Sequence, residues 1–126
     1  MASRGALAGR KVLVVEDNFL IAEHVRSVLL REGCEVVGPA ARVAQALALV
    51  RAVEALDGGV LDINLGKELC FPVAAALAER SVPWVFLTGY EGRAIVPEQF
   101  AARPLLSKPV NDRRLLEVIK ATIESA

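Results

Sequence analysis

The sequence has no excess of positive or negative charge and few aromatic residues. The balance of charge argues against a protein that binds nucleic acid non-specifically. Its 126 residues carry 15 basic and 15 acidic side chains, so the formal net charge at pH 7 is zero. Such a chain lacks the positive field that drives non-specific binding to nucleic acid. We therefore expect no direct contact with nucleic acid. Aromatic side chains make up only 5% of residues, whereas small and aliphatic ones abound, as suits helices packed on a sheet.

Cysteines and long apolar runs are scarce as well. Cys34 and Cys70 are far apart and form neither a C-x-x-C pair nor a metal-ligand cluster, so two free thiols in a reducing compartment are expected. No apolar run approaches the roughly 20 residues of a membrane helix. Residues 1–11 lack the apolar core of a signal peptide. These absences predict a cytoplasmic protein with no membrane contact.

What the chain does contain is an alternation of short apolar runs with amphipathic segments. The runs predict buried strands at residues 11–15, 35–38, 58–62, 82–88 and 104–107. Helical spacing predicts four helices between and after them, the first capped by Asn18 and stopped by Gly33, the last capped by Asn111. The alternation predicts a single α/β domain at residues 10–126, with a parallel sheet, helices on both faces and a flexible tail at 1–9.

Residues 91–103 lack the pattern of a helix. Gly92 costs a helix interior about 1 kcal/mol relative to alanine, and Pro97 about 3 kcal/mol. The segment also has too few apolar residues to cover a sheet with a helical stripe. We expect it to be largely non-helical and mobile, and to form a switching surface.

Polar residues follow the ends of four predicted strands. Glu16 and Asp17 follow the first strand, Asp62 closes the third, Thr88 closes the fourth and Lys108 follows the fifth. The carboxyl ends of parallel strands meet at one edge of a sheet, where ligands bind. Clustered carboxylates favour a divalent cation, and oxygen ligands suit Mg²⁺. Acid, metal, hydroxyl and ammonium groups together predict phosphoryl transfer to a carboxylate, with the central Asp62 as nucleophile.

Each residue alone has a simpler interpretation. Glu16 and Asp17 could merely favour the start of a helix, and Asp62 could be a turn residue. Their joint placement with a hydroxyl and an ammonium group is what favours a functional site. His24 is expected to be an ordinary helix-surface residue, and Cys70 a packed thiol with nothing nearby to lower its pKa.

Four motifs resemble the receiver domains of two-component systems. They are VLVVEDN at 12–18, LDINLG at 61–66, FLTGY at 86–90 and SKP at 107–109, and the match runs over nearly the whole chain. The resemblance implies a flavodoxin-like, CheY-like fold, a doubly wound five-stranded parallel sheet in the order 2-1-3-4-5. In this chain the family's fourth helix is expected to be weak or absent.

The resemblance also implies roles for the acidic residues. Asp62 matches the phosphoacceptor of the family. Asp17 is expected to bind Mg²⁺ directly and Glu16 through a water molecule. Asn64 is expected to offer its main-chain carbonyl to the same ion.

The remaining motif residues match the phosphoryl-binding groups of the family. Thr88 corresponds to the hydroxyl residue and Lys108 to the lysine that meet the phosphoryl group, and the Lys108–Pro109 bond is expected to be cis. Gly89 leaves access to the acceptor. Leu105 departs from the family, which often has an aromatic switch residue there, so Tyr90 becomes the candidate switch.

The strings around Thr88 and Asn64 resemble the atypical "FAT GUY" receivers. This resemblance implies a sensor histidine kinase, of the HWE or a related type, or a phosphotransfer protein as partner. The downstream partner is not indicated, and the chain could be a stand-alone regulator or part of a larger protein. No enzymatic activity is expected beyond Mg²⁺-dependent self-phosphorylation from a phosphodonor and slow autodephosphorylation.

Three other functions fit the pattern less well. A pseudo-receiver that only binds a protein partner would not need the complete set of phosphorylation residues. A flavodoxin-like cofactor binder needs a glycine- or hydroxyl-rich phosphate loop after the first strand, where this chain has acids. Aspartate-based phosphohydrolases usually have an acid two residues after the nucleophile, and here that residue is Asn64.

Overall fold

The computed structural model describes residues 7–89 and 92–125. Within these ranges the chain forms five strands and four α-helices, which confirms the predicted alternation. The elements are β1 (Lys11–Val15), α1 (Phe19–Arg31), β2 (Glu35–Ala40), α2 (Val43–Ala52), β3 (Gly58–Asp62), α3 (Phe71–Glu79), β4 (Trp84–Thr88), β5 (Leu105–Ser107) and α4 (Asp112–Glu124). No helix in these ranges has the length and apolar character to cross a membrane.

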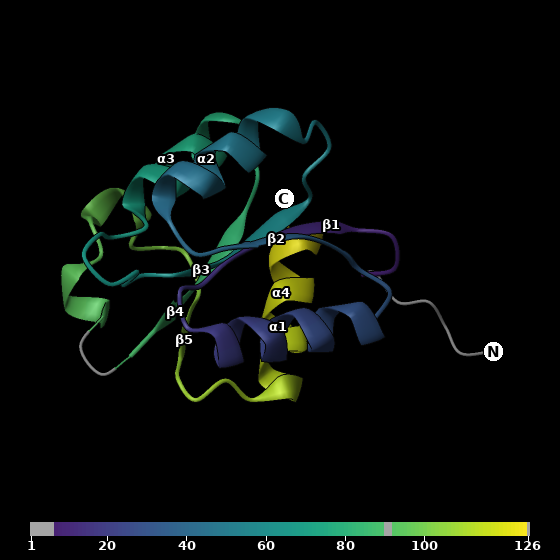
Figure 1. Ribbon diagram of the computed structural model, residues 1–126. Helices are drawn as coiled ribbons and strands as arrows, with labels where there is room; N and C mark the ends of the chain where they lie inside the picture. Colours follow the sequence, from purple (N-terminus) through teal and green to yellow (C-terminus); the bar gives the residue numbers. More distant parts are fainter. Residues whose placement is uncertain (1–6, 90–91, 126) are drawn as a thin grey trace.

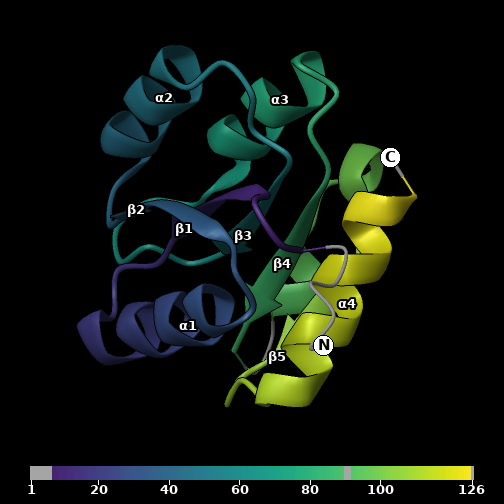
Figure 2. The same ribbon diagram turned by 90° about the vertical axis from the view of Figure 1, so that its right-hand side faces the viewer.

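The five strands form one parallel sheet in the order β2-β1-β3-β4-β5. Helices α1 and α4 cover one face of the sheet, and α2 and α3 cover the other (Figures 1 and 2). Every residue of β3 and β4 is buried, as expected for strands enclosed by helices on both sides. The predicted doubly wound α/β fold with strand order 2-1-3-4-5 is therefore confirmed.

Apolar side chains on the two faces of the sheet form two separate cores. Leu13 and Phe86 belong to the core beneath α2 and α3. Val12 and Val85, their neighbours in sequence, belong to the core beneath α1 and α4, because successive strand residues point to opposite faces. A Cβ on Gly58 would lie 3.0 Å from a side-chain carbon of α4. Glycine at this position of β3 thus allows α4 to pack directly on the sheet.

The predicted helix caps are confirmed. Asn18 accepts a hydrogen bond from the Ile21 N–H at 3.0 Å, and Asn111 accepts one from the Arg114 N–H at 2.9 Å. Helix α1 ends just before Gly33, whose φ of +89° is easily adopted by glycine. These caps fix where the loops beside the acidic residues begin and end.

Several boundaries differ from the sequence-based expectations. Strand β2 continues to Ala40, which pairs with Val15 beyond an irregularity in the register. Strand β4 begins at Trp84 rather than 82, because Pro83 has no N–H for the ladder. Leu7 is only 3% exposed and joins the core beneath α1 and α4. Packed structure therefore begins before residue 10, while residues 1–6 of the expected tail lie outside the described part.

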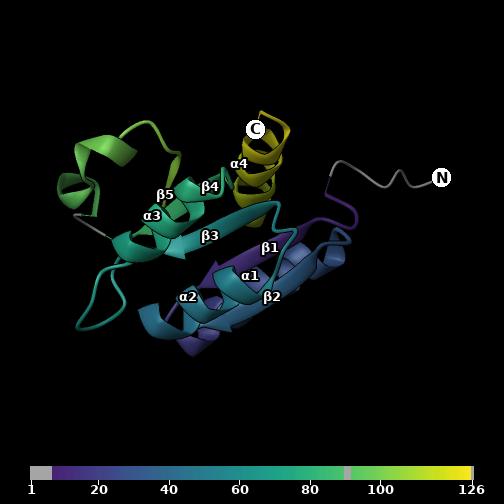
Figure 3. The same cartoon turned by 90° about the horizontal axis from the view of Figure 1, so that it is seen from above.

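The segment after β4 forms two short 3₁₀ helices, Gly92–Ile95 and Glu98–Phe100, and no α-helix in its described residues, 92–103. This agrees with the expected absence of a fourth family helix. The segment lies beside α3 and β5 (Figure 3). Phe100 is buried, with its ring centroid 5.4 Å from that of Trp84 and 6.3 Å from that of Phe71. One aromatic side chain thus anchors the segment on the core.

Candidate functional site

The structure brings the predicted polar residues to the carboxyl edge of the sheet. Asp62 and Thr88 are the last residues of β3 and β4, and Glu16 and Asp17 directly follow β1. Lys108 directly follows β5. The side chains of Glu16, Asp62 and Thr88 are almost wholly buried, whereas Asp17 is exposed. Four strands therefore deliver polar groups to one place, as the sequence predicted.

Three carboxylates form a cluster in this place. One ligand oxygen from each of Glu16, Asp17 and Asp62 lies within 4.8 Å of the others. Two buried atoms of the cluster, Glu16 Oε1 and Asp62 Oδ2, face a positively charged group in the described part of the chain, the Lys108 ammonium at 3.0 and 3.1 Å. Buried carboxylate oxygens normally have a donor or a cation as partner. The three carboxylates of the cluster outnumber the ammonium group that faces it, so the cluster can accommodate a further cation.

Lys108 supplies the cation of the chain itself. Its Nζ lies 3.0 Å from Glu16 Oε1 and 3.1 Å from Asp62 Oδ2, as ion pairs, and it donates a hydrogen bond to Glu16 Oε2 at 3.3 Å. The Lys108 main-chain N–H donates to the Thr88 carbonyl at 2.8 Å, which fixes the start of the side chain. The Lys108–Pro109 peptide bond is cis, as predicted. One ammonium group thus faces two of the three carboxylates.

The ionisable groups of the cluster shift one another's pKa values. Burial, together with the hydrogen bond and negative charge of Glu16, raises the pKa of Asp62 to about 7, although Lys108 opposes the rise. Burial disfavours the charged form of Lys108, but the hydrogen bond to Glu16 and the charge of Asp62 outweigh it and raise the Lys108 pKa. Lysine therefore stays charged, while Asp62 needs further positive charge to be fully ionised at neutral pH.

This donor set suits Mg²⁺. The ion prefers oxygen ligands and is commonly bound by one or two carboxylates, water and phosphate oxygens. The exposed carboxylate of Asp17 and the buried one of Asp62 offer such ligands within 4.8 Å of each other. A cation placed there would offset the excess negative charge of the three carboxylates and would lower the raised pKa of Asp62.

The hydroxyl residue and its neighbours lie at the end of β4. Thr88 Oγ1 donates a hydrogen bond to the Gly89 carbonyl at 3.2 Å. Gly89 is exposed, and a Cβ placed on it would meet no atom within 4 Å. Leu105, at the position of the usual aromatic switch, is half-buried on β5. Tyr90, the predicted switch residue, lies outside the described residues.

The loop after β3 lies against the acidic cluster. Asn64, two residues beyond Asp62, is exposed, and its Oδ1 accepts a hydrogen bond from the Gly66 N–H at 3.0 Å. Gly66 has a φ of +86°, and a Cβ on it would lie 3.6 Å from Asp17 Oδ2. The sequence analysis assigned no role to Gly66. Its place at the end of the LDINLG motif was a sign that the backbone needs a glycine there.

Two further side chains match their expected structural roles. His24 on α1 is half exposed, and its Nε2 lies 2.6 Å from Asp112 Oδ1 at the start of α4. Cys70 is buried, and burial, with the negative charge of Asp62, raises its pKa to about 12. The interpretation of Cys70 as a packed, unreactive thiol is supported by this environment.

Comparison with known proteins identifies the same four motifs as parts of one domain. Residues 12–120 match the response regulator receiver domain. The transcriptional regulatory protein BtsR of Salmonella typhi is 31% identical over 107 residues, which are 83% of this chain and 44% of that protein. The chain thus spans less than half of this relative's length.

Solved structures give the same result. The solution structure of SdrG from Sphingomonas melonis Fr1 is 37% identical, with a TM-score of 0.79, and the match covers 95% of this chain and 98% of that one. The response regulator PhyR from Brucella abortus is 25% identical with a TM-score of 0.80, covering 94% of this chain and 49% of that one. With its strand order, its acidic cluster and the match over residues 12–120, the chain belongs to the response regulator receiver domain family, the receivers of two-component phosphorelay signalling.

Proposed function

We propose that Asp62 accepts a phosphoryl group in a Mg²⁺-dependent reaction and that this modification changes a protein-interaction surface. The observation that carries the proposal is the setting of Asp62. Its buried carboxylate lies 3.1 Å from the Lys108 ammonium and within 4.8 Å of two further carboxylates. A carboxylate so placed has both an ammonium group and potential metal ligands close by, as phosphoryl transfer requires.

In the proposed reaction an Asp62 oxygen attacks the phosphorus atom while the bond to the donor's leaving atom breaks. The leaving group keeps the electron pair of that bond, so atoms and charge balance. Asp17, Asp62 and the main-chain carbonyl of Asn64 would hold Mg²⁺, with Glu16 acting through water. When bound, the ion supplies positive charge to the phosphoryl oxygens. Lys108, whose ammonium lies 3.1 Å from Asp62 Oδ2, would neutralise negative charge on the acyl phosphate.

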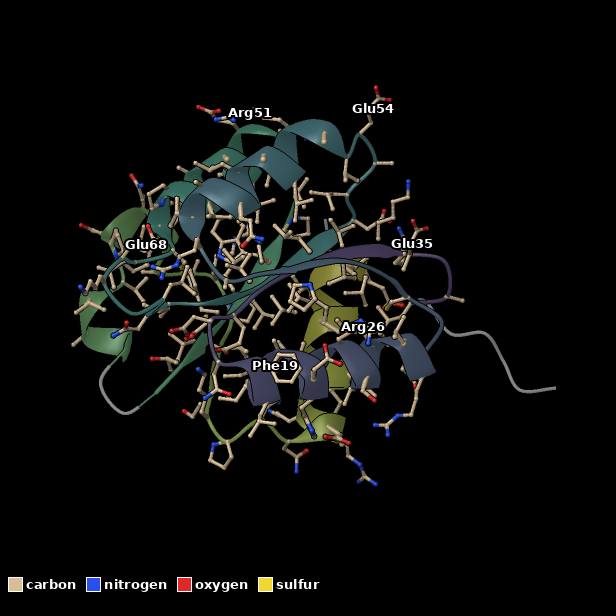
Figure 4. All side chains as sticks on the ribbon, in the orientation of Figure 1. Phe19, Arg26, Glu35, Arg51, Glu54 and Glu68 are labelled. Atoms are coloured by element: carbon tan, nitrogen blue, oxygen red, sulfur yellow. The ribbon has the colours of Figure 1, made fainter. Side chains whose placement is uncertain are left out.

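The proposed donor is a sensor histidine kinase, of the HWE or a related type, or a phosphotransfer protein. The likeness of FLTGY and LDINLG to "FAT GUY" receivers supports the kinase type, and membership of the receiver domain family supports a kinase or phosphotransfer partner in general. Phe19 and Leu20, at the start of α1, are 74% and 76% exposed and follow the acidic pair closely in sequence. Figure 4 shows Phe19 on this first turn of α1. Apolar side chains beside the acceptor suit contact with a protein donor.

The chain acts as a signalling switch in this proposal and not as a turnover enzyme. Asn64 offers an amide where an aspartate-based phosphatase has its general acid, so hydrolysis of the acyl phosphate should be slow. Thr88 would turn from the Gly89 carbonyl toward the phosphoryl group, and the segment after β4 would follow. Two buried free thiols fit a cytoplasmic location, which is part of the same proposal.

Incubation with acetyl phosphate tests the function without a kinase. The wild-type protein should gain the mass of one phosphoryl group in the presence of Mg²⁺ and none with a chelator. Asp62→Asn, which keeps the size of the side chain, should gain none in either condition. Equal labelling of Asp62→Asn and wild type would contradict the proposal.

A further inference from the structure

The loop between β3 and α3, residues 63–70, is closed by its own backbone. The Cys70 N–H donates to the Ile63 carbonyl at 3.0 Å, and the Leu65 N–H donates to the Glu68 carbonyl at 2.9 Å. These two bonds tie the ends of the loop together and tie Leu65 to Glu68. The position of the whole loop then depends on what holds it from outside.

Helix α2 provides an external attachment for this loop. Its N-cap residue, Arg42, makes no side-chain capping bond, and its first turn has no acidic residue. The Val43 N–H instead donates to Glu68 Oε2 at 2.9 Å. A carboxylate at a helix N-terminus satisfies a free N–H and lies at the positive end of the helix dipole. Glu68 therefore caps α2 from a distance of 25 residues in sequence.

The opposite side of the loop lies at the acidic cluster. Gly66, two residues before Glu68, lies beside Asp17, and a Cβ placed on it would be in ordinary contact with Asp17 Oδ2 at 3.6 Å. Asn64, two residues earlier still, is tied to Gly66 by a 3.0 Å hydrogen bond. Figure 4 shows Glu68 on this loop at the edge of the molecule, ahead of α3. The loop therefore spans the short path from the α2 cap to the proposed metal ligands.

We infer that Glu68 is a positioning residue for the phosphoacceptor site. By binding the N-terminus of α2, its carboxylate holds the 63–70 loop so that Asn64 and Asp17 keep the spacing that Mg²⁺ needs. Helix α2 is a firm support, because Ala46 and Val50 bury its other face in the core. The inference rests on the proposed function, since it assigns Glu68 to the metal site of the same reaction.

Calorimetric titration with Mg²⁺ and labelling by acetyl phosphate test the inference. Glu68→Ala should weaken Mg²⁺ binding by about ten-fold, as loss of a residue that orients metal ligands typically does. The Mg²⁺ concentration for half-maximal labelling should rise by the same factor, with little change in the rate at saturating Mg²⁺. Glu68→Gln keeps an acceptor oxygen and should recover most of the affinity. Glu54→Ala, which removes an exposed carboxylate after α2, should match wild type.

A second variant separates positioning from simple stabilisation of α2. Adding Arg42→Ser to Glu68→Ala places a capping hydroxyl on the helix itself. This double variant should regain thermal stability but not Mg²⁺ affinity. Recovery of both properties, or wild-type Mg²⁺ affinity in Glu68→Ala, would overturn the inference. Failure of the proposed function is a separate result, because it requires that wild type itself is not labelled on Asp62.

Discussion

At the residue scale, Glu16 and Asp17 are neighbours in sequence but lie in different surroundings. Glu16 is buried and already paired with Lys108 at 3.0 Å, and it accepts a hydrogen bond from the Asn18 N–H at 3.0 Å. Asp17 is exposed and contributes an oxygen to the carboxylate cluster. The two carboxylates therefore have unequal freedom to bind a metal ion directly.

This difference predicts unequal losses of Mg²⁺ affinity. Asp17→Ala removes a direct ligand and should weaken binding more than Glu16→Ala, which removes a group acting through water. We expect Glu16→Ala to lower the Mg²⁺ affinity by about ten-fold, as is typical for residues that act on a metal ion indirectly. Asp17→Ala should lower the affinity by more. A Mg²⁺ titration that ranks the two variants in the reverse order would refute these roles.

The raised pKa of Asp62 predicts how metal-free stability depends on pH. In the folded protein the pKa is about 7, whereas its usual value is 3.8. Between these values the folded state binds the proton that the unfolded state has released, so the free energy of unfolding falls as pH rises through this window. Below the window both states are protonated, and the Asp62 contribution no longer changes with pH.

Denaturant unfolding in the presence of a chelator measures this dependence. The midpoint of wild type should fall as pH rises from about 4 to about 7. Asp62→Asn cannot ionise at this position, so its denaturation midpoint should depend less on pH. The midpoint of Asp62→Asn relative to that of wild type should therefore rise with pH. Parallel curves for the two proteins would show that Asp62 has an ordinary pKa.

At the element scale, the described segment 92–103 is the least regular part of the domain. Its two 3₁₀ helices are too short to bury a helical face, and Phe100 is the buried aromatic residue that holds it. The Arg103 guanidinium lies 4.6 Å from the centre of the Trp84 ring and covers that side of the core. A segment with so few core contacts should open at low free-energy cost.

Amide hydrogen exchange tests whether this segment switches. Residues 91–103 should exchange fast without phosphate and more slowly once Asp62 is phosphorylated. Phe100→Ala, which removes the anchor, should speed exchange in this segment while α1 keeps its protection, because α1 packs in the other core. Strong protection of residues 91–103 in both states would mean that the segment is a stable element and not a switch.

At the scale of the whole molecule, the features that could be predicted are those encoded by local pattern. Strands such as β1 and β3 are short apolar runs, and the caps at Asn18 and Asn111 depend on residues three positions away. The acidic site followed from the fold, because parallel strands bring their carboxyl ends together. The fold and the position of the acidic site could therefore be predicted from the sequence alone.

The features that could not be predicted depend on contacts between distant segments. The bond from the Val43 N–H to Glu68 joins the start of α2 to a loop 25 residues away, and the lack of a capping side chain at Arg42 was the local sign of it. Burial of Leu7 depends on a core assembled from other elements, and the extension of β2 to Ala40 depends on pairing with β1. Local propensity contains none of this tertiary information.

The central claim for the whole molecule is that Asp62 is the phosphoacceptor. The most direct measurement is to phosphorylate the protein with acetyl phosphate and Mg²⁺, reduce the acyl phosphate with borohydride and sequence the peptides by mass spectrometry. Reduction converts a phosphorylated aspartate into homoserine and so marks the acceptor permanently. We predict homoserine at position 62, and only when Mg²⁺ is present. Homoserine at another position, or a mark at position 62 that forms equally without Mg²⁺, would contradict it.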